Sequence, residues 1–150
     1  MAYAGYSAYS RIANTIDSKE IMLVKLLEGT VRYIQFARGG LEAKNPQVKG
    51  ENISRAVAII VELDAALDRS VGGNLVENLS ALYRYILARL TLANLKNDDT
   101  MLQEVESLMA TIRDGFKGAL EQQQKASAVG TASFDASASS TLKRGFCIAA

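Results

Sequence analysis

Apolar residues recur at helical spacing between Ile53 and Asp98, on both sides of a Gly72-Gly73 pair. At 100° per residue, the segment before the glycines has one apolar face, made of Ile53, Ala56, Val57, Ile60, Leu63 and Leu67. The segment after the glycines has another, made of Leu75, Leu79, Leu82, Ile86, Leu90 and Ala93. Because a short connection makes consecutive helices antiparallel neighbours, the pattern predicts a helical hairpin.

The second helix of this hairpin carries more apolar surface than one stripe requires. Val76, Tyr83 and Leu87 lie on one flank of its predicted core face, and Tyr85 and Leu92 lie on the other. A helix that is apolar over so wide an arc is either deeply buried in a bundle or has a partner. Both interpretations stay open at this point, since packing inside the bundle also accounts for the tyrosines and for Leu87.

A long helix is predicted before the hairpin. It begins at a cap at Asp17 or Ser18 and runs to about Lys44, where Asn45-Pro46 ends it and a loop follows to Gly50. Its core face comprises Leu23, Leu26, Leu27, Thr30, Ile34, Ala37 and Leu41, and Met22, Tyr33 and Phe36 form a second apolar row beside it. Three glycines in this helix each cost roughly 1 kcal/mol relative to alanine. We therefore expect close backbone packing at Gly29, Gly39 and Gly40.

A fourth helix is predicted after a polar turn at Asn94 to Asp99. Thr100 and Gln103 offer a capping box, and the helix runs from Met101 to about Gln123. Its apolar stripe is narrow, and it comprises Met101, Leu102, Val105, Leu108, Met109, Ile112, Phe116 and Leu120. This one-sided helix completes an all-α antiparallel up-and-down four-helix bundle.

The two ends of the chain differ from the helical core in composition. Residues 1–16 form an N-terminal cap segment, extended or a short helix, with Tyr3, Tyr6 and Tyr9 among small residues. This segment is either a frayed terminus or a cover that lays its rings on an apolar groove. Residues 126–150 are rich in Ala and Ser and lack periodicity, which predicts a flexible tail. The bundle domain is therefore assigned to residues 1–125.

Composition and charge exclude several classes of function. The 150 residues fit one domain, and a net charge of +1 with interspersed signs gives no footprint for nucleic acid. The longest apolar run, Ala56 to Val61, is too short for membrane insertion. There is no histidine and a single cysteine, Cys147, so we expect a cytoplasmic protein that is not an enzyme and has no metal or cofactor. The last four residues also match a prenylation pattern, which by itself is a weak signal.

The residues of the hairpin and its flanks resemble a known family. The run from Leu67-Asp68 through Gly72-Gly73 to Leu82-Tyr83 and Tyr85 is its most specific part. Further matches are Met22, Leu26, Glu28 and Gly29, then Ile53, Arg55, Ala56, Glu62 and Leu63, then Asn78, Arg89-Leu90, Ala93-Asn94, Asn97-Asp98 and Ile112-Arg113-Asp114. Together they resemble the cytoplasmic flagellin export chaperones of the FliS family over about Ser10 to Leu120. Lys19 departs from the family, which usually has proline there.

The resemblance implies a mechanism and a set of binding residues. Family members bind the C-terminal segment of flagellin, prevent its premature polymerisation and deliver it to the flagellar export gate. We expect the flagellin groove to be lined by Tyr6, Tyr9, Met22, Tyr33, Phe36, Ile59, Val76, Tyr83 and Leu87. The alternative is a self-associating helical bundle, whose surplus apolar surface is a homodimer interface or fits a different helical partner.

Overall fold

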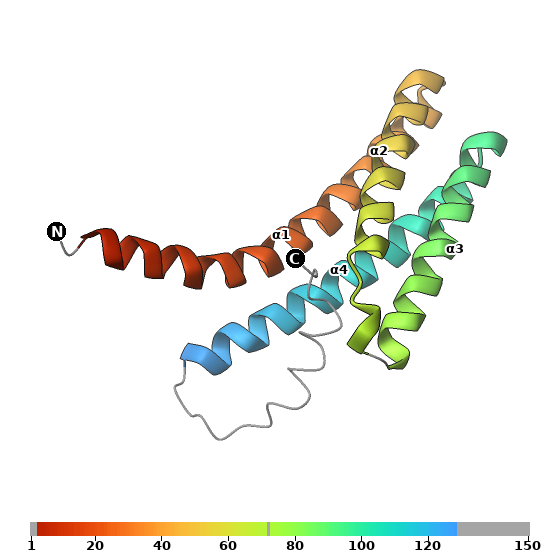
Figure 1. The fold of residues 1–150 in the computed structure, drawn as a ribbon. Helices are drawn as coiled ribbons and strands as arrows, with labels where there is room; N and C mark the ends of the chain where they lie inside the picture. Colours follow the sequence, from red (N-terminus) through yellow and green to blue (C-terminus); the bar gives the residue numbers. More distant parts are fainter. Residues whose placement is uncertain (1–2, 72, 129–150) are drawn as a thin grey trace.

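The described part of the chain folds into four α-helices and one short 3-10 turn (Figure 1). The computed structural model describes residues 3–71 and 73–128, with side chains described from Lys19 onward. The elements are α1 (Tyr3–Glu42), α2 (Pro46–Ala65), η1 (Arg69–Val71), α3 (Asn74–Lys96) and α4 (Asp99–Ala128). All the regular elements in this part of the chain are helical, so the predicted all-α class is confirmed.

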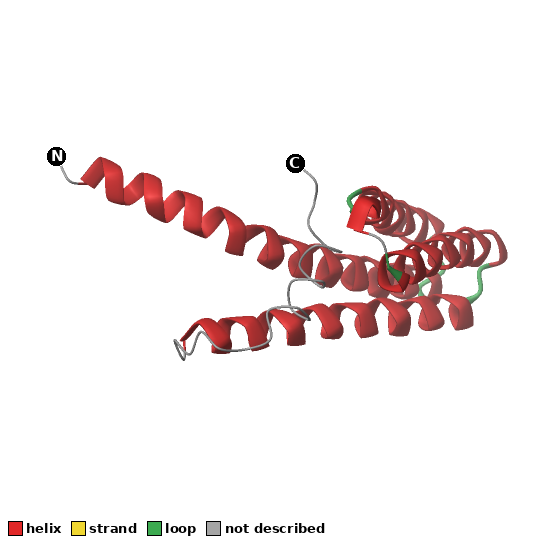
Figure 2. Ribbon diagram, turned by 60° about the horizontal axis from the view of Figure 1, so that its bottom comes forward, coloured by secondary structure: helices red, strands yellow, loops and turns green. Residues whose placement is uncertain are grey.

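The helices are arranged as a bundle in which consecutive helices are neighbours. α1 packs against α2 and α4, and α3 packs against the same two helices, so α1 and α3 are diagonal to each other. The predicted up-and-down four-helix bundle is therefore confirmed. The first half of α1 and the last half of α4 extend beyond α2 and α3 (Figure 2).

One continuous core lies between the helices. Its most deeply buried large side chains are Leu27, Ile34, Ile60, Tyr83, Ile86, Leu90, Leu102, Val105 and Met109. The core faces predicted for α1, α2 and α4 are largely confirmed. On α3 the core face is rotated relative to the prediction, because Val76 and Tyr83 are buried whereas Leu75 is 44% exposed.

Helix α1 begins earlier than predicted. It starts at Tyr3, not at Asp17 or Ser18, and continues for 40 residues. The N-terminal segment contains no proline, and its alanines favour helix, so an established helix propagates backwards through it. Residues 3–16 are therefore part of the long helix rather than a separate segment. At the other end, α4 continues to Ala128, and residues 129–150 of the predicted tail lie outside the described part of the chain.

The loop predicted after Asn45-Pro46 is wrong, because α2 begins at Pro46. The backbone N–H of Val48 donates to Asn45 Oδ1 at 3.2 Å, which makes Asn45 the N-cap. Proline is well suited to the first helical position, where its missing N–H has no helical partner to lose. α1 ends at Glu42, and the pair predicted to end it instead starts α2.

The glycines of α1 differ in their surroundings. A Cβ added at Gly40 would lie 2.7 Å from Lys49 N and 3.0 Å from Val48 Cγ1, so the start of α2 approaches α1 closely at this point. At Gly29 and Gly39 an added Cβ would meet nothing within 4 Å. The predicted close packing is confirmed for Gly40 and wrong for the other two.

The turn from α3 to α4 is shorter than predicted and is held by a buried lysine. α3 runs to Lys96, Asn97 adopts a left-handed conformation with φ of 53°, and Asp98 Oδ1 accepts from the N–H of Met101 at 3.3 Å. The cap of α4 is therefore Asp98, not the predicted Thr100 box. Lys49 is 7% exposed, and its Nζ donates to the carbonyl of Asn94 at 3.0 Å and to Asn97 Oδ1. A cation thus stabilises the C-terminal end of α3.

Candidate partner-binding site

Helix α1 presents an apolar row to solvent. Met22 is 59% exposed and Phe36 is 52% exposed, which is unusual for side chains of this size. Gly29 lies midway between them, at intervals of seven residues, so the three positions follow one line along the helix with a rise of about 10 Å per interval. Because a Cβ added at Gly29 would meet nothing within 4 Å, a partner backbone could approach α1 closely between the two large side chains.

The neighbouring surface of α2 continues this row. Tyr33 on α1 is half-buried, and the guanidinium of Arg55 on α2 lies 5.7 Å from the centroid of its ring. Ile59, one turn further along α2, is also half-buried against the core. We call the surface formed by Met22, Gly29, Tyr33, Phe36 and Ile59 the α1–α2 face. It brings together four of the predicted groove residues from two helices.

Two predicted groove residues on α3 lie inside the bundle instead. Val76 is 6% exposed and Tyr83 is 1% exposed, so they do not form an open flank of the helix. Burial, with a smaller contribution from the charge of Asp64, raises the pKa of the Tyr83 hydroxyl well above its ordinary range. Leu87 is half-buried and packs against the core. The expectation of an accessible flank at Val76 and Tyr83 is wrong, because both residues belong to the core face of α3.

The remaining predicted residues, Tyr6 and Tyr9, lie in the first turns of α1. Their side chains are outside the described part of the structure. The backbone shows only that they belong to the helix that carries Met22 and Phe36. Because they are part of one continuous helix, they cannot fold back over the same helix as a cover in this conformation.

An ordered polar cluster on α3 and α4 was not singled out from the sequence. Glu104 accepts hydrogen bonds from the hydroxyl of Tyr85 and from Arg89, whose Nε lies 2.9 Å from Glu104 Oε2. Both bonds lower the pKa of the Glu104 carboxyl, and the bond to Glu104 raises the pKa of the Tyr85 hydroxyl. Tyr85 is nevertheless 44% exposed, so its ring is held in place at the surface. Tyr85 and Arg89 lie on α3, whereas Glu104 lies on α4. Helical spacing within one segment therefore does not show that these residues are partners.

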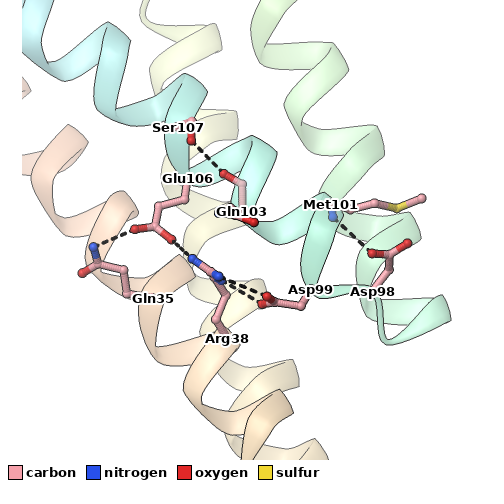
Figure 3. Close-up of polar contacts among 8 residues, drawn as sticks. All are labelled: Gln35, Arg38, Asp98, Asp99, Met101, Gln103, Glu106 and Ser107. Atoms are coloured by element: carbon pink, nitrogen blue, oxygen red, sulfur yellow. Dashed lines mark hydrogen bonds and ion pairs between the residues drawn. The ribbon is translucent and has the colours of Figure 1, made fainter.

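A second cluster joins α1 to α4 and is structural in character (Figure 3). Arg38 donates to both Asp99 oxygens, at 2.8 and 3.0 Å, and to Glu106 Oε2 at 2.7 Å. Gln35 completes it by donating to Glu106 Oε1 at 2.8 Å. The hydrogen bonds from Arg38 lower the pKa of the Asp99 carboxyl. Each of these four side chains is hydrogen-bonded to another member of the cluster. The cluster therefore joins α1 to α4 rather than forming a binding site.

The described residues present an exposed apolar surface on α1 and α2. Among them, no three His, Cys, Asp or Glu side chains are placed to hold a metal ion. None of the described helices combines the length and the apolar character that crossing a membrane requires. The fold and the α1–α2 face define a four-helix-bundle protein with an exposed apolar surface.

Comparison with known proteins gives the family of this bundle. The family model described as "Flagellar protein FliS" matches residues 2–124. The chain belongs to the FliS family, which confirms the resemblance inferred from its sequence. Membership supports a role as an export chaperone and not as an enzyme.

Curated relatives match most of the chain. The flagellar secretion chaperone FliSB of Pseudomonas aeruginosa (strain PAO1) is 38% identical over 114 residues, which cover 75% of this chain and 90% of the relative. The flagellar secretion chaperone FliS of Bacillus subtilis (strain 168) is 36% identical over 121 residues, or 80% of this chain and 89% of the relative. That of Salmonella typhimurium (strain LT2) is 38% identical over 117 residues, or 77% and 85%. The similarity thus spans nearly the whole length of these chaperones.

Proposed function

We propose that this protein is a cytoplasmic export chaperone that binds the C-terminal segment of flagellin on its α1–α2 face. Binding there would hide the segment from other flagellin molecules, prevent premature polymerisation and keep the subunit competent for flagellar type III export. Delivery to the flagellar export gate is part of the same proposal. The single observation that carries it is the exposure of Met22 and Phe36 on either side of the open position at Gly29.

The α1–α2 face suits an amphipathic helix. Such a helix is recognised when its apolar side chains enter a groove between helices of the partner. Met22 and Phe36 would supply the large apolar contacts, and Gly29 would let the two backbones come close. Tyr33 is already ordered by Arg55, so less conformational entropy is lost when a ligand covers it.

The first turns of α1 extend the proposed surface. Since α1 is continuous from Tyr3, Tyr6 and Tyr9 would contact the cargo directly rather than cover the groove. Removal of residues 1–10 should then weaken the binding of a flagellin C-terminal peptide. Tighter binding after the deletion would instead support a cover that cargo displaces.

The proposal is tested by titrating the full chain with a peptide of the flagellin C-terminal segment. Met22→Asp and Phe36→Asp should each weaken binding at least tenfold, which corresponds to about 1.4 kcal/mol, since a desolvated charge without a partner is unfavourable. Val61→Asp on α2 is a matched control, because Val61 is 48% exposed and lies away from the α1–α2 face. Thermal unfolding of each free variant shows whether the fold is retained.

Filament assembly gives the functional readout of the same variants. The unsubstituted chain should suppress flagellin polymerisation at equimolar ratio, and Phe36→Asp should not, while Val61→Asp should behave as the unsubstituted chain does. Unchanged affinity and unchanged suppression in both α1 variants would contradict the proposed site. Failure of the unsubstituted chain to bind the peptide at all would contradict the proposed cargo.

A further inference from the structure

Helix α3 carries a second apolar stripe, which faces away from the core. Ala81, Tyr85, Ala88, Leu92 and Leu95 follow one another at intervals of four and three residues. At 100° per residue they occupy an arc of about 80°, centred about 170° from the middle of the core face. Tyr85 is 44% and Leu95 is 79% exposed, both alanines are exposed, and Leu92 is half-buried. We call these five residues the outer stripe of α3.

The spacing of the outer stripe is that of a helix that packs against another helix. Apolar residues at alternating intervals of three and four are the seam of a coiled coil. From Ala81 to Leu95 the seam is about 21 Å long, which is long enough for two heptads of contact. The two alanines leave space for large side chains of a partner, and Tyr85 and Leu95 supply large ones.

The aromatic residue of the stripe is ordered before any partner binds. Glu104 on α4 accepts a hydrogen bond from the Tyr85 hydroxyl, and the guanidinium of Arg89 lies 5.9 Å from the centroid of the Tyr85 ring. Arg89 is itself paired with Glu104, so its charge is largely offset. A tyrosine fixed in this way loses little further freedom on binding, which is a common feature of residues that dominate interfaces.

Charge decides which partner the stripe suits. Arg84 and Lys96 lie about 60° to either side of its centre, both are exposed, and neither forms an ion pair with another residue in the described ranges. Glu77 is the one carboxylate that lies along the stripe on α3, near its N-terminal end. A second copy of the chain on this surface would bring the same cations together, whereas acidic side chains would be attracted to both edges.

We infer that the outer stripe of α3 is a second docking surface, and that it binds an amphipathic helix of a protein other than the cargo. The helix would carry apolar residues at heptad spacing with acidic residues beside them. This inference goes beyond the proposed function, because α3 lies diagonally across the bundle from α1. The chaperone could therefore hold flagellin on the α1–α2 face and a second protein on the outer stripe at the same time.

The inference is tested with two synthetic three-heptad peptides that share leucines at the seam positions and have either glutamate or lysine beside them. Fluorescence anisotropy with the full chain should show binding of the acidic peptide about tenfold tighter than that of the basic one. The double variant Arg84→Glu/Lys96→Glu should reverse this preference. The matched control, Lys25→Glu/Arg32→Glu, makes the same change of charge on α1 and should leave the preference as it is.

Further variants separate the alternatives. Leu95→Asp should weaken binding of the acidic peptide at least tenfold while the thermal unfolding midpoint stays within a few degrees, since Leu95 is 79% exposed. The same variant should bind the flagellin peptide as the unsubstituted chain does, so this test is independent of the proposed cargo site. The inference would be overturned if the unsubstituted chain bound the acidic and the basic peptide with equal affinity. It would also be overturned if only the Lys25→Glu/Arg32→Glu control lost the preference for the acidic peptide. A dimer of the full chain in sedimentation equilibrium that Leu95→Asp abolishes would overturn it in favour of self-association.

Discussion

Alanine substitutions at two glycines of α1 are expected to change stability in opposite directions. A Cβ at Gly40 would meet backbone atoms of α2, with Lys49 N at 2.7 Å and Lys49 Cα at 3.2 Å. That backbone has little freedom to move, because the N–H of Asn45 donates to the carbonyl of Gly40 at 2.8 Å and Asn45 also caps α2. A Cβ at Gly29 would meet nothing within 4 Å.

The magnitudes follow from two effects. Replacing glycine by alanine in a helix interior stabilises by about 0.5–1 kcal/mol, because the unfolded chain has less entropy to lose. Overpacking a tight contact costs about 1–3 kcal/mol. Gly29→Ala should therefore raise the free energy of unfolding by about 0.5–1 kcal/mol. Gly40→Ala should lower it by about 1–2 kcal/mol, since the steric cost exceeds the gain in helix propensity.

Equilibrium unfolding in urea measures both changes, and Gly39→Ala is the closest control. It is adjacent to Gly40 in sequence but meets nothing within 4 Å, so it should be neutral or stabilising. For a bundle of this size, 1 kcal/mol corresponds to a shift in Tm of about 3–5 °C. A Gly40→Ala variant as stable as the unsubstituted chain would refute the close approach of α1 and α2. A Gly29→Ala variant destabilised by about 1 kcal/mol would show that another group occupies the space beside it.

Three further substitutions test other parts of the bundle. Lys49→Met removes the donor to the carbonyl of Asn94 and to Asn97 Oδ1 and should lower the free energy of unfolding by about 1–2 kcal/mol; an unchanged urea midpoint would show that this cap is unimportant. Tyr83→Ala should cost about 3–5 kcal/mol, because the ring is fully buried, and a loss below 1 kcal/mol in the same assay would contradict its place in the core. The pKa of Asp99 is lowered by Arg38, so this ion pair contributes stability above about pH 4 that is lost as the pH falls further. Arg38→Ala should therefore reduce the drop in urea midpoint between about pH 6 and pH 3, and an equal drop in both proteins would exclude this contribution.

Helical spacing predicted the order of the helices and most of the core, but it left the rotation of α3 undetermined. The set that begins at Leu75 and includes Leu82 has almost the same periodicity as the set that begins at Val76 and includes Tyr83. Both place Leu79, Ile86, Leu90 and Ala93 in the core. The choice between them depends on how α3 packs against α2 and α4, which is a tertiary effect that periodicity does not contain.

The candidate site was predictable as apolar residues on individual helices, but not as contacts between helices. The exposed row of Met22 and Phe36 follows from the surplus apolar residues on α1. The pairs that cross between helices, such as Arg55 with Tyr33, depend on the relative register of two helices, for which the sequence has no local signal. The same reason accounts for the cap supplied by Lys49, whose partners, Asn94 on α3 and Asn97 directly after it, are 45 and 48 residues away.

Site-specific photocrosslinking at position 36 tests the central claim most directly. A photoreactive phenylalanine analogue at position 36 keeps an aromatic ring at a site where the native side chain is 52% exposed, and the same analogue at position 61 is the control. The proposed function predicts that, with flagellin present, position 36 forms crosslinks to the C-terminal segment of flagellin and position 61 does not. Crosslinks from position 61 alone, or crosslinks from position 36 to another region of flagellin, would contradict it.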